Sequence, residues 1–140
     1  MNKKILTLLL LLIAISTISI VSAQDTQKIG DVEFNVPEGY VYDEDSVNIF
    51  LEAFADDETI DDAGVFVKDD IDLLAILVCS EAQDTDYVSD YEIENKTIAN
   101  KTGTLFTAPD ETNVVFMYEE GDKFILIQAI DEDTIEATIK

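Results

Sequence analysis

The sequence predicts an α+β fold: a mostly antiparallel sheet of about six strands, a short C-terminal helix, and room for one further helix. Three observations lead to this expectation. Residues 24–140 contain several apolar and β-branched runs that have the length of a strand. Short stretches rich in glycine, asparagine and aspartate separate these runs, which is typical of hairpins. Residues 47–54 and 133–139 instead space their apolar residues as one face of a helix does.

The chain begins with a segment that has the three parts of a secretory signal. Two lysines precede the apolar run Ile5–Val21, and the small residues Ser22 and Ala23 follow it. We expect residues 1–23 to be a cleaved signal peptide. The alternative is an uncleaved N-terminal anchor, because the run has about the minimum length, near 17 residues, that spans a bilayer. Both alternatives place residues 24–140, a single acidic domain, outside the cytoplasm, either secreted or at the cell surface.

The first part of this domain combines one clear strand with one ambiguous segment. Residues 24–28 are a polar lead-in, and residues 31–36 alternate apolar and polar side chains as a half-buried strand does. Residues 47–54 fit both the helical period and the alternation of a strand, and we favour the helix. The acidic stretch 56–64 is expected to be a solvated loop.

Six further segments have strand character. They are residues 64–68, 71–80, 96–99, 104–107, 113–119 and 123–130. The 71–80 segment is apolar on both faces, which is typical of a strand in the middle of a covered sheet. Residues 100–103 are expected at the tip of a hairpin, because Asn100 and Gly103 tolerate positive φ angles. Asp133 is expected to cap the closing helix.

The order of these elements resembles a known group of proteins. The stretches that carry the likeness are GDVEFNVPEGY at 30–40, KTIANKTGTLF at 96–106 and VVFMYEEGDKFILIQAIDEDTIE at 114–136, behind a signal-like segment. Together they are similar to small secreted proteins of unknown function from methanogenic archaea. The resemblance covers most of the acidic domain. It implies an envelope or extracellular location and assigns no catalytic or binding residue.

The charge of the domain restricts its partners. All 31 acidic residues lie in residues 24–140 with six lysines, a formal net charge of −25, and there is no arginine or histidine. Such a surface repels nucleic acids and anionic lipid headgroups. We therefore expect no nucleic-acid partner, and membrane contact only through an uncleaved N-terminal segment. The expected partner is a basic protein or a cation-rich layer of the envelope. The oligomeric state stays open.

The residue types also argue against catalysis. Serine and cysteine nucleophiles of the common kind need an imidazole base, and the chain has no histidine. The single cysteine, Cys79, lies in an apolar run and is expected in the core. We expect no enzyme activity and no cofactor.

Calcium is the one ion that the composition favours, because Ca²⁺ binds carboxylate oxygens. The candidate ligands are Asp56, Asp57, Asp61 and Asp62. No stretch fits an EF-hand loop. The alternative is that these residues are solvated and that cations only screen them diffusely.

Two glycosylation sequons lie close together, Asn95-Lys96-Thr97 and Asn100-Lys101-Thr102. Asn100 is the stronger candidate for modification, because a hairpin turn is accessible. The alternative for both is ordinary turn chemistry.

Three functions follow as hypotheses. The first is a non-catalytic secreted or surface domain with a structural or binding role in the envelope. The second is a small carrier that holds a lipid or other hydrophobic ligand on an apolar sheet face. The third is a weak divalent-cation-binding module.

Overall fold

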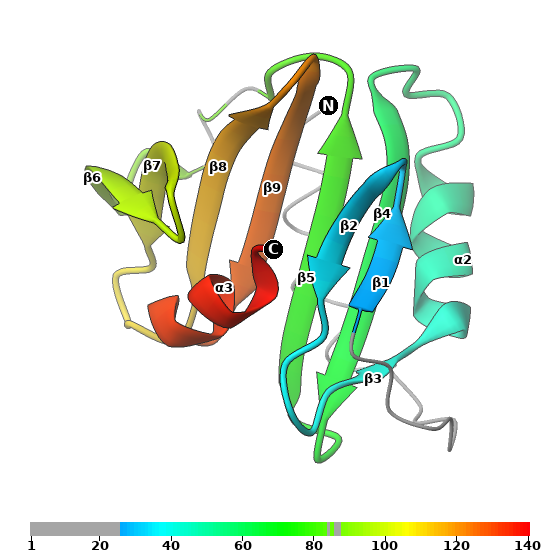
Figure 1. Ribbon diagram of the computed structural model, residues 1–140, viewed down its shortest axis with the longest axis horizontal. Coiled ribbons are helices and arrows are strands. Elements are labelled where there is room, and N and C mark those ends of the chain that lie inside the picture. Colours follow the sequence, from blue (N-terminus) through cyan, green and yellow to red (C-terminus); the bar gives the residue numbers. More distant parts are fainter. Residues whose placement is uncertain (1–25, 84, 86–87) are drawn as a thin grey trace.

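A computed structural model describes residues 26–83, 85 and 88–140. It confirms the predicted α+β class: a seven-stranded antiparallel sheet, a two-stranded hairpin, one internal helix and a short C-terminal helix (Figure 1). The elements are β1 (Thr26–Ile29), β2 (Val32–Asn35), β3 (Val41–Tyr42), α2 (Glu44–Ala53), β4 (Ile60–Lys68), β5 (Asp72–Cys79), β6 (Glu92–Ile98), β7 (Lys101–Thr107), β8 (Val114–Glu120), β9 (Lys123–Ala129) and α3 (Glu132–Thr138). The predicted signal segment, residues 1–23, lies outside the described residues. Among the helices that are described, none is long and apolar enough to cross a membrane.

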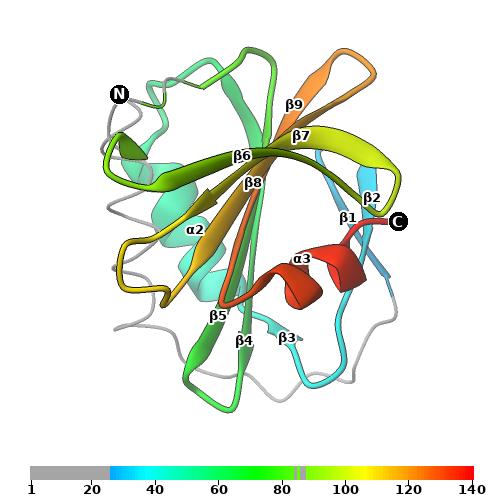
Figure 2. The ribbon, with the colours of Figure 1, turned by 90° about the vertical axis from the view of Figure 1, so that its left-hand side faces the viewer.

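The sheet has the strand order β3-β4-β5-β9-β8-β7-β6, so β5 is internal and β6 forms an outer edge. Figure 2 shows α2 on one side of the sheet, with α3 and the β1–β2 hairpin on the other. We call these sides the α2 face and the α3 face. The first carries Val65, Leu77 and Val115, and the second carries Ile76 and Phe116. Every residue from Leu73 to Cys79 is buried, which confirms the prediction of a strand covered on both faces.

Residues 47–54 are helical for most of their length, as predicted. α2 begins after Asp43, whose carboxylate accepts hydrogen bonds from the backbone N–H of Ser46 at 3.2 Å and from its hydroxyl at 2.9 Å. Val47 and Phe50 are buried against the sheet, whereas Ile49 is exposed. A strand would have placed Val47 and Ile49 on the same face. The N-cap and the helical period therefore outweigh the alternation.

Two predictions for the first part of the domain were wrong. The lead-in 24–28 overlaps β1, which pairs with β2 through Gly30 and Asp31, both at positive φ. The sequence pattern does not indicate β1, because only the last residue of this strand is buried. The acidic loop 56–64 also ends early, since β4 starts at Ile60 with an irregularity in pairing before Asp62. Asp62 fits in a strand because its carboxylate accepts a hydrogen bond from the Gly30 backbone.

Two boundaries in the second part also differ from the prediction. The β6–β7 turn consists of Ala99 and Asn100, with φ angles of 49° and 69°, so residues 101–103 belong to β7 rather than to the tip. The cap of α3 is Asp131 and not Asp133, because the Asp131 carboxylate accepts hydrogen bonds from the backbone N–H and hydroxyl of Thr134. Asp133 lies in the first turn instead, where a negative charge favours the helix dipole.

Candidate functional site

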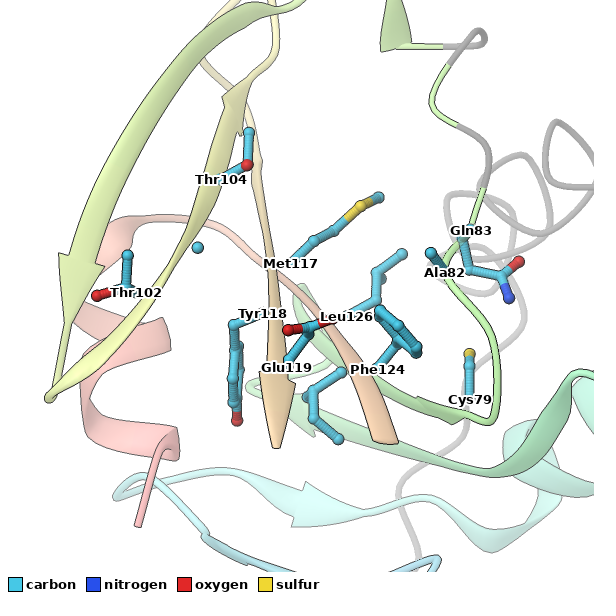
Figure 3. A pocket seen from close by; sticks show the side chains of 12 residues that line it. Cys79, Ala82, Gln83, Thr102, Thr104, Met117, Tyr118, Glu119, Phe124 and Leu126 are labelled. Carbon is cyan, nitrogen blue, oxygen red and sulfur yellow. The ribbon is translucent and has the colours of Figure 1, made fainter. Parts of the chain in front are cut away.

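A groove of about 290 Å³ opens on the α2 face over β7, β8 and β9. Figure 3 shows its lining: Met117 and Phe124 project from the sheet on the side of Ala82 and Gln83. α2 packs on β4, at the other side of the same face. The helix therefore leaves part of this face uncovered, and the described 80–83 segment borders the space that remains.

The polar groups of the groove are few. Gln83 donates hydrogen bonds from Nε2 to the Thr59 hydroxyl at 3.2 Å and to the Glu81 carbonyl at 3.3 Å. Its Oε1 atom is buried and has no hydrogen-bond partner within the described part of the chain. Thr102 and Thr104 of β7 border the opposite side. The groove therefore suits a small apolar molecule that carries a hydrogen-bond donor.

Cys79 lines this groove as an inert side chain. It is 1 % exposed, which confirms the predicted core position. Burial, together with the nearby carboxylates of Asp57 and Asp61, raises the pKa of the thiol to about 12. The reactive thiolate is therefore disfavoured at neutral pH, and Cys79 contributes apolar surface rather than a nucleophile.

The four candidate calcium ligands have separate surroundings. Asp57 is buried, and its Oδ1 accepts hydrogen bonds from the Thr59 backbone at 3.0 Å and hydroxyl at 2.6 Å. Asp61 pairs with Lys123, Asp62 holds the β1–β2 turn, and Asp56 is exposed.

No group of three or more Asp, Glu, Cys or His residues is placed to hold a metal ion in the portion of the chain that is described. The sequence could not show this separation, because it depends on where β4 starts and which way each carboxylate points.

Both sequon asparagines are exposed. Asn100 lies in the two-residue turn, as predicted, and Asn95 lies on the edge strand β6. The Thr104 hydroxyl donates a hydrogen bond to Asn95 Oδ1 at 3.3 Å. Because Thr104 also lines the groove, Asn95 stands beside it. Modification of either asparagine stays a prediction.

Four of the six lysines of residues 24–140 pair with carboxylates. Lys96 pairs with Glu132 at 2.6 Å and Lys101 with Glu120 at 2.5 Å. Lys123 pairs with Asp61, and Lys140 with Glu33. Among the described acidic residues, Asp43 and Asp57 are the buried ones. These four positive charges are thus locally neutralised, while most of the described carboxylates face solvent.

The groove itself was missed from the sequence. The alternation of Met117 with its neighbours, and of Phe124 with Leu126, indicates a shared face within each strand, but not which part of that face a helix covers. No family model, curated protein or solved structure matches the chain. The resemblance to small secreted archaeal proteins therefore stays a prediction.

Proposed function

We propose that this protein is a non-catalytic acidic domain that acts outside the cytoplasm, secreted or at the cell surface, and binds a basic or cation-rich partner of the envelope. The observation that supports it is the arrangement of charge. Four of the six lysines of residues 24–140 are each held by a carboxylate, while nearly all described acidic side chains reach solvent.

This arrangement gives a strong negative potential with little positive charge to interrupt it. Such a potential attracts cationic partners over about a Debye length, roughly 8 Å at physiological salt, and speeds their encounter. The burial of Cys79 and the lack of histidine support a binding role over a catalytic one.

The test measures how tightly the purified protein binds an immobilised basic protein at NaCl concentrations between about 50 and 500 mM. Over this range the screening of surface charges becomes strong. We expect the affinity to fall by at least about tenfold across this range. The double variant Asp69→Asn/Asp70→Asn should weaken binding without unfolding, because Asn tolerates the positive φ angles of 55° and 61° found there. Binding that is unaffected by salt would contradict the proposal.

The groove supports a second candidate function, a carrier for a small apolar molecule. Its apolar floor and the unpaired Gln83 oxygen favour a ligand with one donor group. Mass spectrometry of an organic extract of the purified protein should find a bound molecule. The variant Thr104→Tyr should exclude it by filling the groove from β7. An extract of folded protein that contains no ligand would remove this candidate.

A further inference from the structure

A second cavity of about 240 Å³ lies on the α2 face at the opposite end of β5 and β9 from the groove. The groove is lined by Cys79 and Phe124, where β5 ends and β9 begins, whereas this cavity is lined by Asp72 and Gln128, where β5 begins and β9 ends. It is therefore a separate space with its own walls.

The walls are mostly apolar, and part of them faces solvent. Leu73 and Ala129 are buried, while Ile71 is 71 % exposed and Ile130 is also exposed. Exposed side chains of this size are costly in water. Their position around the cavity gives an entering hydrocarbon chain apolar surface to cover.

Gln128 is a polar residue at a position of β9 where the alternation of the strand predicts an apolar side chain. Leu126, two residues earlier on β9, is buried in the core of the α2 face. Gln128 is itself only 2 % exposed, and its Oε1 atom has no hydrogen-bond partner within the described residues. Buried carbonyl oxygens are nearly always hydrogen-bonded, so an unpaired one calls for an explanation.

Asn113 provides a second acceptor in the same cavity. Its Nδ2 donates to the Thr112 hydroxyl at 3.3 Å, whereas its Oδ1 is buried and unpaired within the described chain. Asp72 borders the cavity as well, but strand alternation turns its side chain away from that of Leu73, toward the α3 face. The cavity thus offers two amide oxygens among apolar walls.

We propose that this cavity binds a small hydrophobic primary ammonium ion. The ammonium group carries three N–H donors and no acceptor, so it pairs with Gln128 Oε1 and Asn113 Oδ1. The hydrocarbon part covers Ile71 and Leu73. The net charge of −25 further favours a cation over a neutral or anionic molecule of the same shape.

The test is a titration of the full chain, isotopically labelled for nuclear magnetic resonance, with n-butylammonium at constant ionic strength. We expect saturable shifts of the Gln128 and Asn113 side-chain amide signals, and affinity at least about tenfold above that for tetramethylammonium, which has the charge but no N–H donor. Equal affinity for the two cations would show that charge alone explains the binding, without hydrogen bonds from N–H donors. Equal affinity for butanoate would show that the site offers donors. Either result, or the absence of saturable shifts, would overturn the proposal.

Variants locate the site. Gln128→Leu should weaken n-butylammonium binding by at least about tenfold, because a charged donor loses a buried acceptor. Gln83→Leu, in the groove, is the matched control and should bind as the unchanged protein does. Asn113→Ala provides a second measure if Gln128→Leu does not fold: it should also weaken binding of n-butylammonium, because it removes the other buried acceptor. Unchanged n-butylammonium affinity in either folded variant, Gln128→Leu or Asn113→Ala, would overturn the proposal.

Discussion

The Cδ1 atom of Ile29 lies 2.2 Å from the point where a Cβ atom on residue 64 would stand, so the glycine at this position of β4 makes room for the β1–β2 hairpin. Gly64→Ala should therefore push the hairpin from the sheet and lower the free energy of unfolding by about 1–3 kcal/mol. Chemical denaturation measures this loss. Gly121→Asn is the control, because nothing lies within 4 Å and Asn tolerates its φ of 62°. A Gly64→Ala protein as stable as this control would contradict the fit.

Gly103→Ala should be more damaging than Gly64→Ala. The added Cβ would stand 2.2 Å from the backbone oxygen of Met117, whereas at residue 64 it meets the flexible end of a side chain. Relief at Gly103 requires β7 to move away from β8, which strains their hydrogen bonds. The same denaturation measurement compares the loss of stability in the two variants. A smaller loss for Gly103→Ala than for Gly64→Ala would show that β7 and β8 can separate locally at little cost.

The two helix caps should differ in strength. The Asp43 carboxylate is buried and bonds both the backbone and the hydroxyl of Ser46, whereas Asp131 is exposed. Asp43→Ala should cost about 1–2 kcal/mol and Asp131→Ala about 0.5–1 kcal/mol. Thermal unfolding of both variants measures the difference. Equal losses would mean that burial adds nothing to the cap of α2.

Stability should decline at alkaline pH. Burial raises the pKa of the Cys79 thiol from 9.0 to about 12, and burial likewise raises the pKa of the Tyr118 phenol. These groups leave stability unchanged below about pH 9. As the pH rises toward 12, the unfolded chain releases protons that the folded protein retains, so unfolding becomes easier. Denaturation between pH 8 and pH 11.5 measures the fall.

Tyr118→Phe should show a shallower decline over the same range, because the variant has no phenol to ionise. A profile as steep as that of the unchanged protein would show that the phenol of Tyr118 does not contribute.

Calcium should have no specific effect. The carboxylates of Asp57, Asp61 and Asp62 are each occupied by a different partner, so added divalent ions are expected to act by screening. Ca²⁺ and Mg²⁺ at equal ionic strength should raise Tm by similar amounts. A rise that is specific to Ca²⁺ and lost in Asp57→Asn would instead establish a calcium site.

The fold was predictable from the sequence where one period of apolar residues dominates. Residues 71–80 are apolar on both faces and correspond to β5, which is buried on both sides. The segment 47–54 fits both the helical period and the alternation of a strand. The helix is favoured by the cap at Asp43, a contact that the apolar pattern does not contain. β1 escaped notice because Ile29 is its only buried residue.

The candidate site was less predictable, because its parts are distant in sequence. Cys79 was correctly placed in the core by its apolar neighbours. The groove beside it depends on how far α2 extends over the face, which no local pattern reports. Gln128 carried a weak signal, a polar residue within an apolar strand, yet only the structure shows that its side-chain oxygen is buried and unpaired.

The position of β6 at the rim of the sheet has one more consequence. Its outer backbone groups face away from β7, which is the arrangement that lets strands of separate molecules join. Glu92 and Glu94 are exposed along this strand, so two copies that approach rim to rim repel each other. The negative charge that attracts cations therefore also opposes the joining of molecules into filaments through their β6 strands. A high salt concentration screens this repulsion.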